Sequence, residues 1–234
     1  SIATNTINSP ATPPEGQSAL AEQASSAMSQ VLNLLNTQYD GNSLFGGDAN
    51  NSLPMVSATA AGGPQDTVAS VLNAAVAAKG GPLSSSDITN LINGPDGLAS
   101  VFNNTNSNPA MNYNGAFYTG STDGQPTKIM IGLNQTLQYN VSGNQPAFTN
   151  LMQGLSMLSM LGAPSSQLDS SAKSTLLQQA GSMITQAQGE LTTQQGQLGT
   201  VQSQLQQVTD TQQSAYSATM QQITTLEQAN TSGD

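Results

Sequence analysis

The C-terminal quarter of the chain, residues 168–230, contains no proline and is predicted to form one very long helix. Its seam positions recur at alternating steps of four and three residues, and all but Gln194 are apolar: Ala180, Ile184, Ala187, Leu191, Gln194, Leu198, Val201, Leu205 and Val208. This heptad pattern is typical of a helix that packs along a seam against other helices. At about 1.5 Å per residue the helix would be roughly 90 Å long, which is more than one compact domain of this size needs.

The seam changes phase after Val208. A continued pattern would use Gln212, Ala215, Thr219 and Gln222, whereas the bulkier side chains lie one position further on, at Tyr216, Met220, Ile223 and Leu226. Such a stutter relaxes a supercoil locally. Our hypothesis is that it marks the point where the helix passes from packing within its own subunit to packing against neighbours.

Four glycines weaken this helix, because each costs on the order of 1 kcal/mol relative to alanine in a helix interior. They are Gly181, Gly189, Gly196 and Gly199. We therefore expect the stability of the helix to come from packing on other helices of the same chain and on neighbouring copies.

Composition excludes several classes of function. The chain has 13 acidic residues against 3 lysines, a net charge of −10, and no Arg, His, Cys or Trp. Without His and Cys, common zinc sites, cysteine nucleophiles and histidine bases are excluded. The charge gives no electrostatic footprint for nucleic acid or an anionic membrane, and no apolar run is long enough to span a bilayer.

Only 7% of the residues are charged, and Asn, Gln, Ser and Thr take their place. A neutral, amide-rich surface permits identical subunits to pack closely. A compositional bias of a secreted or acidophile protein explains it equally well.

The remaining pattern predicts a set of shorter elements. The first helix is expected from Thr12, as N-cap of a capping box with Glu15, to about Gln38. Further helices are expected at 65–79, 84–93 and 147–161. A hairpin is expected from 43–47 and 53–57, and a small antiparallel sheet from 116–119, 127–133 and 136–141.

The predicted fold class is mainly α with an α+β insert. Residues 1–58 and 147–234 would form a discontinuous long-helix rod domain, an antiparallel helical bundle with a small hairpin. Residues 59–146 would form an inserted outer domain with two short helices and a small antiparallel sheet.

Three segments resemble a known family. Leu32–Gly47, LNLLNTQYDGNSLFGG, resembles the place in the flagellin superfamily where a helix ends in a tyrosine-glycine turn and an LFGG hairpin. Tyr118–Leu158 and the final residues ITTLEQANTSGD are similar to segments of the hook-filament junction proteins, the FlgL-type flagellar hook-associated proteins. Within that family the chain would be a core fragment that lacks the terminal helices.

The resemblance implies a structural protein of the bacterial flagellum, which joins hook to filament and templates flagellin assembly. Such a protein is exported through the type III apparatus without a cleaved signal peptide and acts outside the cell in motility. Its implied partners are copies of itself in a ring, flagellin and the first hook-associated protein, with room for an export chaperone. The alternatives are a filament flagellin subunit, or a surface adhesin or glycan-binding module that holds a saccharide against Tyr113 or Phe117.

Residues with catalytic or binding chemistry have structural explanations. Ser170 and Lys173 match S-x-x-K, but the companion motifs of penicillin-recognising enzymes are missing. The carboxylates Asp87, Asp96 and Asp123 lie in turn or cap contexts, and the segments 40–42 and 48–51 lack a calcium-loop pattern. Core packing is expected for Met152, Met157, Met160, Tyr113, Phe117 and Tyr118. We therefore predict no enzyme and no catalytic, cofactor-binding or metal-binding residue.

Overall fold

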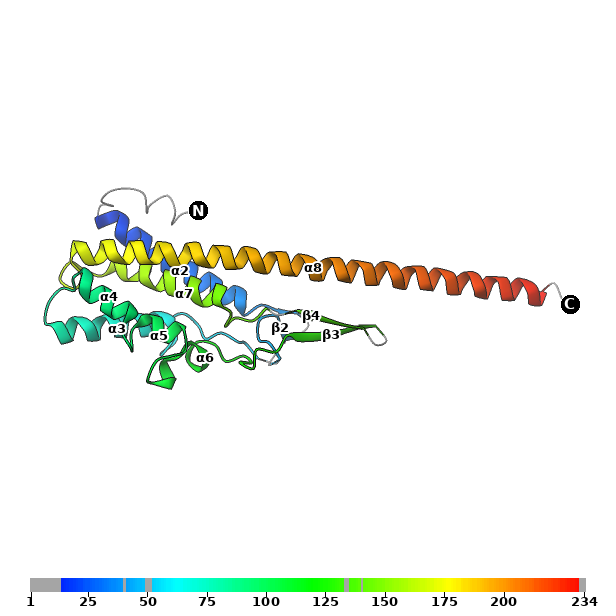
Figure 1. Cartoon of the computed structure of the whole chain (residues 1–234), viewed down its shortest axis with the longest axis horizontal. Coiled ribbons are helices and arrows are strands. Elements are labelled where there is room, and N and C mark those ends of the chain that lie inside the picture. The colour runs from blue at the N-terminus through cyan, green and yellow to red at the C-terminus, as the bar shows by residue number, and fades with distance from the viewer. Residues whose placement is uncertain (1–13, 40, 49–51, 133–134, 140, 232–234) are drawn as a thin grey trace. The chain divides into compact units, whose positions relative to one another are not determined.

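The computed structural model describes residues 14–231, except 40, 49–51, 133–134 and 140 (Figure 1). Within them the chain is mainly helical, with two small two-stranded antiparallel sheets. It divides into two compact units. Unit 1 consists of residues 1–126 and 140–192, and unit 2 of residues 127–139 and 193–234. These boundaries differ from the predicted domains 1–58 with 147–234 and 59–146, which stay a prediction.

Unit 1 holds most of the elements. Their bounds in chain order are α2 Pro14–Leu35, β1 Gln38–Tyr39, β2 Asn42–Ser43, α3 Pro64–Lys79, α4 Ser85–Asn93, α5 Leu98–Phe102, η1 Pro109–Met111, α6 Tyr113–Ala116, α7 Pro146–Ser159 and η2 Met160–Gly162. Helix α8, Ser170–Thr231, begins in unit 1 and continues into unit 2. Unit 2 also contains the hairpin of β3, Thr127–Gly132, and β4, Gln135–Tyr139.

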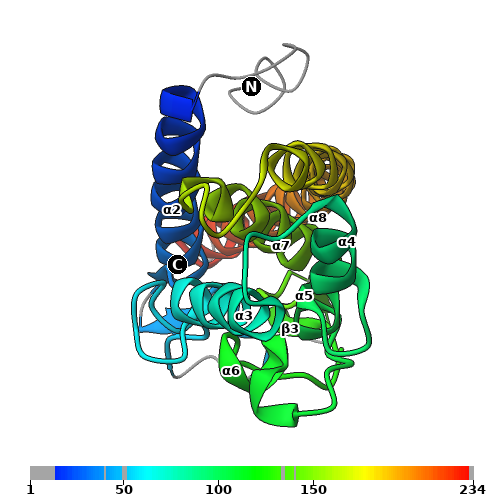
Figure 2. The ribbon, with the colours of Figure 1, turned by 90° about the vertical axis from the view of Figure 1, so that its left-hand side faces the viewer.

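Helix α7 is the centre of unit 1. It runs between α2 and the first turns of α8, in the direction opposite to both (Figures 1 and 2). Of its 14 residues, 11 are buried. The core that surrounds it is made of apolar side chains from all three helices: Leu20, Met28, Leu32, Leu35, Met152, Leu158, Ala172, Leu176, Ala180 and Ile184.

Helices α7 and α8 are in close contact at Gly154. A Cβ atom on Gly154 would lie 2.8 Å from Ile184 Cγ1 and 3.3 Å from the carbonyl oxygen of Ala180. No side chain fits there, so the backbone of α7 rests directly on α8. This contact anchors α8 within unit 1.

A second layer, formed by α3, α5 and α6, lies on one side of these three helices (Figure 2). Its centre is an aromatic cluster in which the ring centroids of Phe102, Tyr113 and Phe117 are 5.8–5.9 Å apart. The Tyr113 hydroxyl donates a hydrogen bond to the Gly143 carbonyl at 2.8 Å. Burial of the rings, with the one buried hydroxyl satisfied, fastens this layer to the segment that leads into α7.

Several predicted elements are confirmed. The expected helices at 65–79, 84–93, 147–161 and 168–230 correspond to α3, α4, α7 with η2, and α8. Gly80 closes α3 with φ 73°, the left-handed conformation that glycine adopts without strain. The first helix ends at Leu35 rather than Gln38, and the predicted N-cap Thr12 lies outside the described residues.

Two strand predictions are wrong. Residues 43–47 and 53–57 do not pair with each other, because the hairpin forms earlier, between β1 and β2, and Met55 forms an isolated bridge with Tyr118. Residues 116–119 are not a strand of the small sheet, since Gly115, with φ 104°, turns the chain at the end of α6. The sheet has only two strands, β3 and β4, paired in the register Ile129↔Leu137.

We expect Gly154→Ala to lower the free energy of unfolding by about 1–3 kcal/mol, because the methyl group overpacks the α7–α8 contact. The matched control is Gly189→Ala, whose Cβ meets nothing within 4 Å. It should raise stability by up to about 1 kcal/mol through helix propensity. Urea denaturation measures both, and equal effects at the two positions would contradict the role of Gly154.

Alkaline pH should unfold the protein through its buried tyrosines. Desolvation raises the pKa of Tyr113 well above its usual range and that of Tyr118 to about 12. Both folded-state pKa values exceed the unfolded value of about 10, so this stabilisation is complete below pH ~10 and is lost as the pH rises towards ~12. Urea titrations across this range should show a shallower decline for Tyr113→Phe. A decline as steep for Tyr113→Phe as for the wild type would contradict this role of Tyr113.

Candidate functional site

The first candidate site is the apolar stripe of α8 in unit 2, called the α8 stripe below. It consists of Leu198, Leu205, Tyr216, Met220 and Ile223, which are 40–63% exposed. In unit 1 the same seam is covered, since Ala180, Ile184 and Ala187 are at most 6% exposed. Within the part of the chain that the structure describes, no element covers the stripe as α7 covers the seam in unit 1. The α8 stripe is thus an apolar surface suited to a partner.

Burial along the seam decreases before the phase change. Leu191 is half-buried and Leu198 is exposed, whereas Val201 and Val208 are again half-buried, and the phase shifts only after Val208. The hypothesis that the phase change marks the passage to packing against neighbours stays a prediction. Helix α8 is continuous from Ser170 to Thr231, so the shift does not break it.

Many hydroxyl groups of α8 in unit 2 are satisfied by the helix itself. Eight hydroxyl groups donate to the carbonyl oxygen four residues earlier, at 2.8–3.2 Å. They belong to Thr200, Thr209, Thr211, Ser214, Ser217, Thr219, Thr224 and Thr225. A hydroxyl that already donates within its helix loses less when water is removed. Covering these hydroxyls with a neighbouring helix therefore costs little desolvation.

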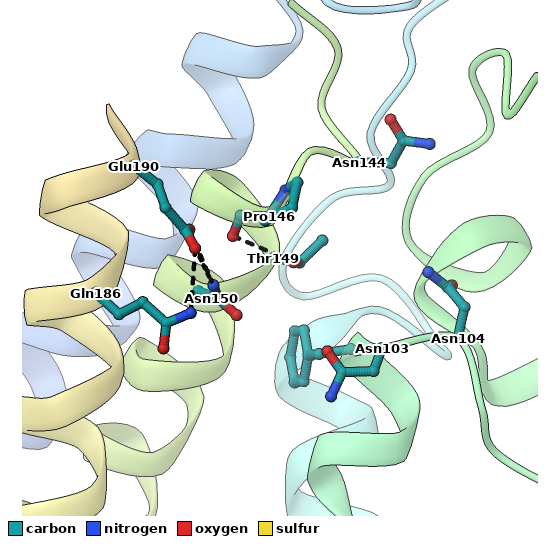
Figure 3. A pocket seen from close by; sticks show the side chains of 9 residues that line it. Asn103, Asn104, Asn144, Pro146, Thr149, Asn150, Gln186 and Glu190 are labelled. Carbon is teal, nitrogen blue, oxygen red and sulfur yellow. Dashed lines mark hydrogen bonds between the residues drawn. The ribbon is translucent and has the colours of Figure 1, made fainter. Parts of the chain in front are cut away.

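The second candidate site is a pocket of about 340 Å³ in unit 1, called the amide pocket below (Figure 3). Residues from the end of α5, the start of α7 and the middle of α8 surround it. They are Phe102, Asn103, Asn104, Asn144, Pro146, Thr149, Asn150, Gln186 and Glu190.

One wall of the amide pocket is built around Glu190. The Asn150 side-chain amide donates to both carboxylate oxygens, at 3.1 and 2.9 Å, and the Gln186 amide donates to Oε1 at 3.1 Å. Asn150 is only 7% exposed, so this contact is nearly closed to solvent. The carboxylate is thereby held by two side-chain amides rather than by a lysine.

The facing wall carries the amides of Asn103, Asn104 and Asn144 (Figure 3). Asn104 adopts a left-handed φ of 59°, which asparagine tolerates, and its oxygen accepts a hydrogen bond from the Asn114 backbone at 2.7 Å. The Asn144 oxygen accepts from the Ser142 hydroxyl at 2.6 Å. These bonds fix Asn104 and Asn144, while Asn103 is exposed.

The aromatic residues named for the glycan alternative lie elsewhere. Tyr113, Phe117 and Tyr118 are 0% exposed, so a saccharide cannot stack on Tyr113 or Phe117. That placement is wrong, because their rings fill the core of the second layer. The expectation that Met152, Met157 and Met160 pack in the core is confirmed, since each is at most 3% exposed.

The carboxylates considered for catalysis hold local structure, as their contexts predicted. Asp87 accepts from the Ser84 backbone at 2.8 Å in a capping box and pairs with Lys79, whose hydrogen bond holds the Asp87 pKa well below its usual range. Asp96 accepts from the Ser107 backbone at 2.8 Å, and Asp123 from the Ser121 hydroxyl at 2.7 Å. Hydrogen bonds from these serines lower the pKa of both carboxyl groups. Their environments give no reason to assign them a catalytic role.

The S-x-x-K pair lies at the start of α8. Ser170 is exposed, and the neighbouring Asp169 caps the helix by accepting from Ser171 Oγ at 2.6 Å and from the Ala172 backbone at 2.7 Å. Sequence reasoning missed this cap. Asp40, Asn50, Asn51 and Asn134 lie outside the described residues.

Comparison with known proteins gives no relative: no family model matches the chain, and no significantly similar curated protein or solved structure was found. Among the described residues, no three acidic side chains are arranged to hold a metal ion. Nor does any helix in the described part of the chain have the length and apolar character needed to cross a bilayer. The family resemblance therefore stays a prediction.

We expect Asn150→Asp to destabilise the protein by about 1–3 kcal/mol at neutral pH, because it places a second carboxylate beside Glu190. The double variant Asn150→Asp/Glu190→Gln places the carboxylate at position 150 and the amide at position 190. Because the amide can again donate to the carboxylate, most of the stability should be recovered. Failure of the double variant to recover would contradict a direct interaction.

Proposed function

We propose that the chain is the core of a flagellar hook-filament junction protein, a structural and non-enzymatic protein exported to the cell exterior. The observation that carries the proposal is the α8 stripe on a helix of 62 residues. A rod with a continuous apolar line and an otherwise neutral surface is suited to assembly with other helices rather than to catalysis.

The segments that resemble the family also fold together, which supports the proposal. Phe45, in the LFGG motif, packs edge-to-face on Phe148, with ring centroids 5.9 Å apart. The backbone amides of Gly143 and Ser121 donate to the carbonyls of Phe45 and Gly46, both at 2.9 Å. The first resembling segment, Leu32–Gly47, is thus bonded to the second, Tyr118–Leu158.

In this proposal residues 1–58 and 147–234 form the rod domain, and residues 59–146 form the outward insert. The α8 stripe packs against neighbouring copies in a ring, which contacts the first hook-associated protein on one side and flagellin on the other. Low charge permits this, since only 7% of the residues are charged and like-charge repulsion between copies is weak.

The proposal is tested in a flagellated bacterium that carries the gene. Deletion should give hooks without filaments and flagellin shed into the medium, and the wild-type gene should restore filaments. Complementation with Leu205→Gln should restore few or none, because each stripe contact then loses roughly 1 kcal/mol or more of apolar burial. Filament counts by electron microscopy measure the difference.

The matched control is Ser203→Gln, which adds the same side chain on the face of α8 opposite Leu205. It should assemble as well as wild type. Full assembly of Leu205→Gln, or normal filaments in the deletion strain, would overturn the proposal. Location of the protein along the whole filament would instead indicate the flagellin alternative.

A further inference from the structure

We propose that the amide pocket binds a neutral saccharide through its hydroxyl groups. This inference goes beyond the junction function and does not depend on it. The pocket lies in unit 1, and the α8 stripe lies in unit 2.

The chemistry of the two walls favours hydroxyl groups. The walls carry the side-chain amides of Asn103, Asn104, Asn144, Asn150 and Gln186. Asn150 and Gln186 donate to Glu190, and the oxygens of Asn104 and Asn144 accept hydrogen bonds from the protein. For a ligand this leaves the carbonyl oxygens of Asn150 and Gln186, the N–H groups of Asn104 and Asn144, and the amide of Asn103. The Glu190 carboxylate adds acceptor capacity between them. A sugar hydroxyl both donates and accepts, so adjacent hydroxyls can use such a mixed set.

The charges that line the amide pocket disfavour ionic ligands. An anion such as phosphate would face Glu190, and the pocket has no lysine with which to hold it. A cation is not required either, because three amide hydrogen bonds already satisfy the carboxylate. A bound metal ion would also compete with Asn150 and Gln186 for the same oxygens. A neutral polar ligand leaves these interactions in place.

The walls are preorganised where a ligand would need them. The buried Asn150 is fixed by its two contacts with Glu190, and Asn104 and Asn144 are fixed by their own hydrogen bonds. The volume of about 340 Å³ is at the lower end of the range for small-molecule sites, roughly 300–1,000 Å³. Phe102, which lines the pocket, is only 1% exposed, so its ring offers no stacking face. We therefore expect selective but weak binding, with a Kd of about 1 mM.

The test is NMR titration of the isotope-labelled chain with glucose, galactose, mannose and N-acetylglucosamine, each in turn. Saturable shifts should appear at the side-chain amides of the pocket for at least one sugar. Asn103→Ala and Gln186→Ala, one on each wall, should each weaken binding about threefold to tenfold. Asn33→Ala, at an exposed asparagine on α2, is the matched control and should bind as wild type does.

Each alternative result is decisive. No saturable shift with any sugar would overturn the proposal, and so would binding that both wall variants leave unchanged. Parallel titrations with calcium chloride and with free arginine test whether the pocket binds a metal cation or a guanidinium group instead. Saturable shifts at the pocket with either of these, and none with sugars, would also overturn it. Since no assembly step is involved, a negative result leaves the junction proposal untouched.

Discussion

The contact of α7 with α8 at Gly154 is the constraint on which the rest of unit 1 depends. Because no side chain fits between the two backbones, α8 is held at Ala180 and Ile184, and α7 becomes the buried centre on which α2 and the aromatic layer pack. The same α8 then continues through residues 193–231 with its apolar line exposed. One helix thus belongs partly to a finished core and partly to a surface suited to a partner.

Replacement of charges by amides and hydroxyls shapes both candidate sites. On α8 the hydroxyls bond to the backbone of their own helix, which lowers the cost of covering that surface. In the amide pocket the same chemistry holds the Glu190 charge without a lysine and leaves polar groups directed at one small space. A chain with 3 lysines and no arginine has few ion pairs available, and amide networks supply specific contacts in their place.

Long periodic elements could be predicted from the sequence, because their patterns repeat often enough to be unambiguous. Helices α3, α4, α7 and α8 are of this kind. Pairing between distant segments could not be predicted: the bridge of Met55 with Tyr118 joins residues whose local patterns favour ordinary strands. The amide pocket combines three separate segments for the same reason. Two features of the sequence belong to it: the amide-rich loop after Phe102, and Glu190, which is an isolated charge next to the seam. Nothing in either feature indicates that the two lie close together in the fold.

The phase change in α8 brings exposed side chains of the α8 stripe close to one line along the helix. In a straight α-helix a strict heptad drifts by about 20° per repeat, so a long partner can follow it only by supercoiling. The eleven-residue step from Leu205 to Tyr216 turns the stripe back by about 20°, since eleven residues complete almost exactly three turns at about 3.6 residues each. Leu198, Leu205, Tyr216 and Ile223 therefore lie close to one line on a straight helix. This geometry favours straight, nearly parallel helices as the cover of α8 over a two-stranded supercoil.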